Sequence, residues 1–254
     1  MRSAVALAAS TSTGVVLSLG PYGATLRPGQ EYAGLYPPPY GPGQDTNCAS
    51  DPESYISVLA EFHLSRLRIY AADPSWDKVQ WIAFETVPVL SEMAAIRRAM
   101  GQLAADGKTK PFWITAAFPG GKHGQLDEQG DSVPVLRVVE AMLGGEEVRP
   151  TGVGINCTNP GYLPSLLAQF AAAVKSLELE TKPWLVAYPD GGAVYDVVSR
   201  TWTEASVGPD EWAQNLLGVV EGQEEWEGCV LGGCCKSSFA EIGALRRAVD
   251  RRAA

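Results

Sequence analysis

The sequence lacks any uninterrupted apolar run of the roughly 18–20 residues that a membrane span needs, so we expect no membrane association. Basic residues are scarce: 20 Lys and Arg stand against 29 Asp and Glu, a formal net charge of -9. A nucleic-acid partner would need a basic face, so the charge argues against one. The five cysteines, two of them adjacent, suit no secreted disulfide scaffold. We therefore expect a reduced, cytoplasmic chain.

The first residues resemble the beginning of a secretory signal peptide, because Met1-Arg2 precedes an apolar stretch at residues 4–9. That stretch is short, and the polar residues 10–13 interrupt it. The pattern favours a helix that leads into the first strand.

Six short segments are continuously apolar, as strands covered on both faces are. They comprise residues 15–19, 81–84, 112–116, 152–155, 184–188 and 229–231. Between and after them, apolar residues spaced by three and four predict amphipathic helices. These helices run over about residues 56–70, 93–103, 163–177, 212–219 and 242–249.

The alternation of strand and helix predicts an α/β fold with a parallel sheet, either open and doubly wound or closed as a (β/α)8 barrel. No Gly-x-Gly-x-x-Gly follows the first strand, so a dinucleotide site lacks its fingerprint. Polar residues directly follow the strands, where a barrel builds its active site. Residues 27–50, 119–132 and 191–209 are long, irregular and expected to be rim loops. A barrel needs eight strands, and six are found.

Three cysteines follow two of the predicted strands. Cys157 ends one strand, and the adjacent Cys234 and Cys235 come after another, behind Gly232-Gly233. If the two strands lie close together, three thiolates could hold one zinc ion and leave its fourth position open. The alternative is that these cysteines are buried and unreactive, since no Cys-x-x-Cys pair is present.

Seven segments, in the right order along the chain, resemble the homocysteine S-methyltransferase family. They are Ser18-Leu19-Gly20-Pro21-Tyr22-Gly23-Ala24 continuing to Glu31-Tyr32-Ala33-Gly34, Phe62-His63 with Arg66, Phe84-Glu85-Thr86-Val87-Pro88, Gly152-Val153-Gly154-Ile155-Asn156-Cys157, Tyr188-Pro189-Asp190-Gly191-Gly192 with Val194-Tyr195-Asp196, Trp202, and Gly232-Gly233-Cys234-Cys235.

The resemblance implies an S-methyltransferase of methionine biosynthesis on a TIM-type (β/α)8 barrel. Cys157, Cys234 and Cys235 would be the ligands of Zn²⁺, and the homocysteine thiol would take the open position. The methyl donor would be a sulfonium compound, S-methylmethionine or S-adenosylmethionine. Glu85 would bind the substrate ammonium group, although it could instead favour the next helix dipole.

Other residues carry weaker expectations. Asn156 is expected at the substrate site, orienting the rim through its amide, or else capping a turn. Tyr22, Tyr32, Tyr36 and Tyr40 would either face a cationic donor or pack the loops. His63 lies on an apolar helix stripe, which favours a core position. Cys48 and Cys229 have no matched role.

The chain departs from the family pattern in two places. The family's first two β/α units have no counterpart, so we expect an incomplete barrel of about six units, one N-terminally shortened domain over residues 1–254. On this interpretation residues 3–9 are the end of the second barrel helix. Asp190-Gly191-Gly192 stands where Asn-Ser-Gly is usual. The alternative function is a non-catalytic zinc-binding remnant that associates with another chain, and unpaired strand edges would also favour a homo-oligomer.

Overall fold

Six parallel strands form one curled sheet at the centre of the molecule. The computed structural model describes residues 2–10, 13–43, 45–48, 52–193, 195–196, 201–203 and 207–253. Each strand pairs with the next strand of the same sheet, in the order β1-β2-β3-β4-β5-β8. The strands are β1 (Val16–Leu19), β2 (Trp81–Phe84), β3 (Phe112–Ala116), β4 (Gly152–Asn156), β5 (Trp184–Tyr188) and β8 (Cys229–Leu231).

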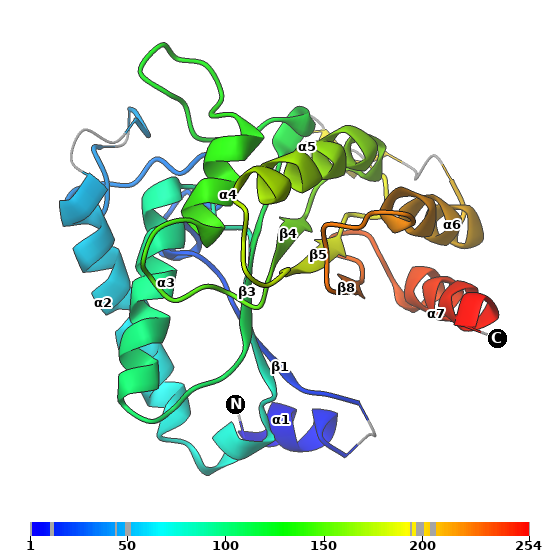
Figure 1. The fold of residues 1–254 in the computed structure, drawn as a ribbon, viewed down its shortest axis with the longest axis horizontal. Helices are drawn as coiled ribbons and strands as arrows, with labels where there is room; N and C mark the ends of the chain where they lie inside the picture. The colour runs from blue at the N-terminus through cyan, green and yellow to red at the C-terminus, as the bar shows by residue number, and fades with distance from the viewer. Residues whose placement is uncertain are drawn as a thin grey trace.

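Helices form an arc around these strands (Figure 1). The α-helices are α1 (Arg2–Ala8), α2 (Pro52–Ala71), α3 (Leu90–Ala105), α4 (Val135–Leu143), α5 (Leu163–Ser176), α6 (Pro209–Val220) and α7 (Phe239–Ala253). Short 3-10 helices are η1 (Tyr22–Thr25), η2 (Pro74–Lys78), η3 (Pro119–Gly121) and η4 (Pro160–Tyr162). None of the helices that the structure describes combines the length and apolar character needed to cross a bilayer.

The predicted strands are confirmed, with differences of one residue at the start of β1 and the end of β4. The helix α4 was not predicted from the sequence. Its apolar residues Val135, Val138, Val139 and Met142 have helical spacing and are all buried. The irregular residues 191–209 contain a small antiparallel pair, β6 (Tyr195–Asp196) with β7 (Thr201–Trp202). Val194, which belongs to the motif around Tyr195, lies outside the described residues.

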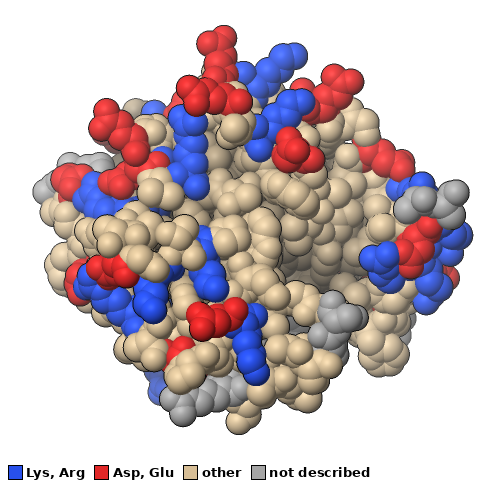
Figure 2. Space-filling view, turned by 60° about the horizontal axis from the view of Figure 1, so that its bottom comes forward, with Lys and Arg blue, Asp and Glu red and all other residues tan. Residues whose placement is uncertain are grey.

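The sheet is an incomplete barrel, as the sequence predicts. In the part of the chain that the structure describes, β1 pairs only with β2 and β8 only with β5, so the two end strands do not meet. The inner face carries a cluster of Trp113 and Val186 with the half-buried Trp81 and Tyr188. Figure 2 shows a hollow lined by side chains that are neither acidic nor basic, with charged side chains around it. Two strand edges are therefore open, and a hollow lined by uncharged side chains lies at the surface.

The main core lies between the outer face of the sheet and the helices. It includes Phe84, Ile114 and Ile155 from the strands and Leu103 and Phe170 from the helices. Gly154 in β4 permits the close pairing with β5, because a Cβ there would lie 1.8 Å from the Val186 carbonyl oxygen. Only glycine fits that approach.

His123 lies in the rim segment after β3 and is 3% exposed. Its ring packs against Phe118, with the ring centroids 5.6 Å apart. Burial lowers the pKa of His123 to about 4 from its ordinary value of 6.5. The neutral imidazole therefore contributes fully to stability above pH 6.5, and the contribution is lost as the pH falls toward 4.

We expect the free energy of unfolding to fall by about 2 kcal/mol more between pH 7 and pH 5 in the unmodified chain than in His123→Gln. The unfolded chain takes up a proton on histidine in this interval, whereas the folded chain does not. Urea unfolding at the two pH values measures the difference. An equal pH dependence in both proteins would show that His123 is not held neutral.

Candidate metal centre

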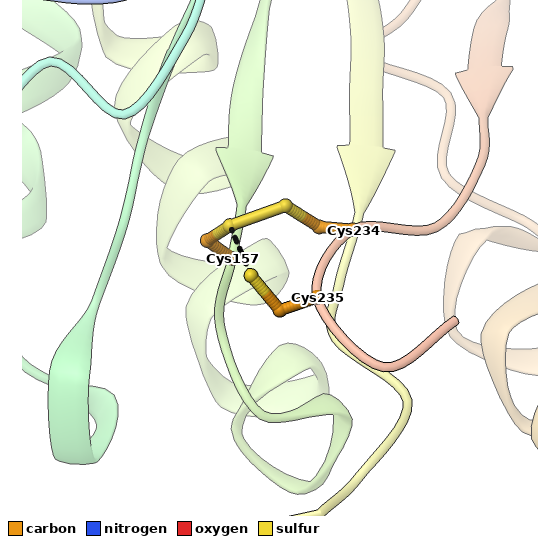
Figure 3. Close-up of side chains that lie close together, drawn as sticks. All are labelled: Cys157, Cys234 and Cys235. Atoms are coloured by element: carbon orange, nitrogen blue, oxygen red, sulfur yellow. Dashed lines mark hydrogen bonds between the residues drawn. A yellow bond between two sulfur atoms is a disulfide. The ribbon is translucent and has the colours of Figure 1, made fainter. Parts of the chain in front are cut away.

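The sulfur atoms of Cys157, Cys234 and Cys235 all lie within 4.8 Å of one another. They converge from two loops, one after β4 and one after β8, and the side chains point toward one another (Figure 3). The Sγ atoms of Cys157 and Cys235 are 3.7 Å apart. This is the only group of three metal-binding side chains of the His, Cys, Asp and Glu types at such range among the described residues. The convergence that the sequence analysis requires is present.

Backbone hydrogen bonds hold the loop after β8 against the end of β5. The amide of Cys234 donates to the Pro189 carbonyl at 2.7 Å, and the amide of Gly191 donates to the Cys235 carbonyl at 2.8 Å. Gly191 has to be glycine, because a Cβ there would lie 2.4 Å from the Lys236 carbonyl oxygen. The amide of Cys157 donates to the Tyr188 carbonyl at 3.3 Å. Both cysteine-bearing loops are thus anchored on the same strand.

The donor set fits a zinc ion. With Zn–S bonds of about 2.3 Å, tetrahedral geometry separates two sulfur ligands by about 3.8 Å. The Cys157–Cys235 separation of 3.7 Å matches that spacing. Three thiolates are soft ligands of the kind that zinc prefers, and they leave one position of the tetrahedron for another ligand.

Cys157 and Cys234 form a disulfide, with their Cα atoms 5.4 Å apart, and Cys235 is a free thiol. A disulfide sulfur carries no thiolate charge, so this pair has to be reduced before all three cysteines can bind a metal ion. Cys48 and Cys229 are free thiols outside the cluster.

Glu85 follows β2 and is half-buried. It accepts a hydrogen bond from the Ser18 hydroxyl of β1. Its carboxylate also acts on Tyr188: burial raises the pKa of the Tyr188 hydroxyl, and the charge of Glu85 adds to the rise. Glu85 therefore lies on the side of the sheet that carries Tyr188, and its role as an ammonium-binding group stays a prediction.

Asn156 is 1% exposed, and both the oxygen and the nitrogen of its side-chain amide form hydrogen bonds with Thr86. The Thr86 amide donates to Asn156 Oδ1 at 2.9 Å, and Asn156 Nδ2 donates to the Thr86 hydroxyl at 2.6 Å. Thr86 has a φ of 60°, a strained conformation for a β-branched residue. Asn156 thus holds the turn beside Glu85, and a direct substrate contact by Asn156 stays a prediction.

Replacing Asn156 with alanine should lower the free energy of unfolding by about 2 kcal/mol, because the partly buried amide and hydroxyl of Thr86 both lose their partner. Thermal or urea unfolding measures the loss. The control is Asn215→Ala on the exposed side of α6, which should change stability by less than about 0.5 kcal/mol. Equal losses in the two variants would contradict this role of Asn156.

The four tyrosines proposed for the donor separate into two groups. Tyr22, Tyr36 and Tyr40 pack with one another and with Leu59 and Val89. Tyr32 alone of the four lines a cavity of about 470 Å³ beside Cys157 and Cys235. Loop packing is therefore the observed role of the first three.

His63 is fully buried in α2, and its Nε2 lies 2.9 Å from Glu92 of α3. Burial lowers the pKa of His63, against the opposing effect of Glu92. Glu92 also accepts hydrogen bonds from the Tyr22 amide and the Tyr36 hydroxyl, each at 2.5 Å. These contacts fasten the loop after β1 to two helices. From the sequence, Glu92 is recognisable only as an acidic residue at the start of a helix, because its contact with His63 depends on how α2 packs against α3.

Comparison with known proteins identifies the family of this chain. A profile of the homocysteine S-methyltransferase family matches residues 1–249. Homocysteine S-methyltransferase 2 of Arabidopsis thaliana is 30% identical over 240 residues, which cover 94% of this chain and 60% of the relative. The betaine-homocysteine S-methyltransferase of Drosophila melanogaster is 30% identical over 239 residues, covering 92% of this chain and 61% of the relative.

A solved structure shows the same fold. The metallated form of the homocysteine methyltransferase MmuM from Escherichia coli superimposes with a TM-score of 0.53 at 24% identity, covering 97% of this chain and 65% of that chain. This chain spans about 60% of the length of the curated relatives that it matches. With the family profile matched over residues 1–249, the chain belongs to the homocysteine S-methyltransferase family.

Proposed function

We propose that this chain is a zinc-dependent S-methyltransferase that transfers a methyl group from a sulfonium donor to homocysteine and forms methionine. The observation that carries the proposal is the convergence of three cysteine sulfurs within 4.8 Å at the carboxyl ends of β4 and β8. S-methylmethionine and S-adenosylmethionine are the candidate donors. The proposed compartment is the cytoplasm, where both cysteines of the disulfide would be reduced.

The residues of this chain would hold the metal ion and align the substrates. Cys157, Cys234 and Cys235 would hold the zinc ion, which lowers the pKa of a coordinated thiol and so supplies a thiolate nucleophile at neutral pH. Glu85 would bind the substrate ammonium, and Asn156 keeps the turn beside Glu85 in place through Thr86. No residue has to act as a general acid, because the group that leaves a sulfonium donor is a neutral thioether. Alignment of two bound substrates supplies the rest of the acceleration.

The test is an assay on protein reduced under argon and loaded with zinc. Methionine formation is followed with homocysteine and each of the two sulfonium donors, and zinc is counted per chain. We expect zinc binding near one ion per chain after reduction, much less without reduction, and turnover with at least one donor. Stoichiometric zinc with no turnover would contradict catalysis by this chain alone, and absence of zinc after reduction would contradict the proposal as a whole.

A second candidate is a non-catalytic zinc-binding protein that acts by associating with another chain, including a second copy of itself. The observation that favours it is the open sheet, with β1 and β8 unpaired on their outer edges in the described structure. Exposed strand edges are templates for pairing. Light scattering on the zinc-loaded protein distinguishes the two: a catalytically active monomer supports the first candidate, and an inactive zinc-binding oligomer supports the second.

A further inference from the structure

The cavity beside the cysteine cluster is lined by an acidic side chain. Asp190 lines it together with Cys157 and Cys235, and no Lys or Arg occurs among the described residues of its lining. The Asp190 carboxylate therefore sets a negative potential there, and no basic side chain in the described lining opposes it. A cavity of this sign favours a cationic ligand and repels a ligand carboxylate.

Asp190 is held firmly at this position. Its amide donates to the Thr158 carbonyl at 3.0 Å, and its carbonyl accepts from Trp212 Nε1 at 3.0 Å. Trp212 is 2% exposed, so the anchor is part of the core. One carboxylate oxygen of Asp190 accepts from the Gly192 amide at 2.8 Å. No described residue donates a hydrogen bond to the other oxygen, so it is available to a ligand.

Burial raises the pKa of the Asp190 carboxyl, against the stabilising hydrogen bond from Gly192. The rise means that the charged form costs free energy in the empty cavity. A cation bound nearby would remove that cost, because an opposite charge stabilises the carboxylate. Binding of a cationic ligand therefore recovers the free energy that burial of the Asp190 carboxylate costs.

Two aromatic rings flank the same space. Tyr32 and Tyr162 both line the cavity and are 41% and 43% exposed, so their rings are accessible. The pKa of the Tyr32 hydroxyl is raised first by burial, then by the negative charges of Cys235, Glu31 and Asp190. Cys235 and Asp190 thus act on one region of the cavity. An onium group in that region would meet a carboxylate and two accessible aromatic rings, both of which attract it.

We infer that Asp190 is a specificity-determining residue that selects methyl donors with a net positive charge over zwitterionic donors. This inference rests on the proposed methyltransferase function. S-methylmethionine carries a sulfonium, an ammonium and a carboxylate, a net charge of one positive unit. Glycine betaine carries a quaternary ammonium and a carboxylate and is neutral overall. The negative charge of Asp190 therefore attracts S-methylmethionine. It gives no comparable net electrostatic attraction to the neutral betaine.

The experiment compares Asp190→Asn with the unmodified chain, both reduced and zinc-loaded, using homocysteine with either S-methylmethionine or glycine betaine. Asparagine has nearly the same shape and can accept the Gly192 hydrogen bond, so only the charge changes. We expect KM for S-methylmethionine to rise about 10-fold with little change in kcat. For betaine, we expect KM, or the inhibition constant against S-methylmethionine if betaine is not turned over, to stay equal or fall. The control is Asp77→Asn in η2, an exposed carboxylate before β2, at the opposite ends of the strands, which should change neither KM.

An unchanged KM for S-methylmethionine in Asp190→Asn, or equal changes for both donors, would overturn the inference. If Asp190→Asn does not fold, the salt dependence of the unmodified chain decides: KM for S-methylmethionine should rise with sodium chloride while KM for betaine does not. If the unmodified chain turns over neither donor, the proposed function fails separately. Calorimetric binding of the same two donors then decides this inference, which requires weaker S-methylmethionine binding in Asp190→Asn and is overturned by equal or absent binding.

Discussion

Replacing Cys234 with alanine should remove the bound zinc and lower methionine formation by at least about 10³-fold. Changes to groups that only support a metal ligand already cost about 10–100-fold in affinity or activity, and Cys234 is itself one of the three converging sulfurs. Two thiolates from Cys157 and Cys235 do not complete a three-ligand zinc site. Zinc is measured by atomic emission on the reduced, dialysed protein, and turnover is measured on the same sample.

The matched control is Cys229→Ala. Cys229 lies in β8 itself, a few residues before Cys234, and its sulfur does not belong to the cluster. This variant should keep both zinc and turnover. Full zinc occupancy and activity in Cys234→Ala would refute the assignment of the three cysteines as a metal centre.

Replacing Glu92 with alanine should lower the free energy of unfolding by about 3–5 kcal/mol, because three groups lose a hydrogen-bond acceptor and each unsatisfied buried group costs about 1–3 kcal/mol. Glu92 and His63 are both fully buried. The loss of the Glu92 carboxylate leaves His63, the Tyr36 hydroxyl and the Tyr22 amide without their acceptor. Urea unfolding at neutral pH measures the change.

The control for this second variant is Glu140→Ala in α4. Glu140 carries an exposed ion pair with Arg137, a kind of pair that contributes little to stability. Its loss should change the free energy of unfolding by less than about 1 kcal/mol. Comparable losses in the two variants would mean that the buried network does not stabilise the loop after β1.

The strands were predictable because buried parallel strands are continuously apolar and short, as in residues 112–116 and 184–188. The helix α4 was missed even though its apolar stripe has helical spacing, because it follows a long Gly-rich loop and holds only nine residues. The unpaired outer edges of β1 and β8 were expected as well, because six strands were found where a closed barrel needs eight. That property depends on how many units the curled sheet contains rather than on any one segment.

The cysteine cluster was predictable because its members follow strands, and parallel strands bring their carboxyl ends to one edge. Other features of the site were not. Asn156 turns its amide to Thr86, and only the strained φ of Thr86 explains why that support is needed. The separation of Tyr32 from the other tyrosines depends on the path of the loop through residues 20–43. No local pattern encodes that path.

The order of pairing in the sheet also determines when the centre can form. Each strand of the six-stranded sheet pairs with the preceding strand of that sheet, so successive units can assemble one after another while the polypeptide is still being synthesised. The cysteine cluster cannot form in this stepwise way, because Cys234 follows Cys157 by 77 residues. The nascent chain can therefore form the strand pairs from β1 to β5 before the proposed metal centre can assemble, because Cys234 and Cys235 come after β8.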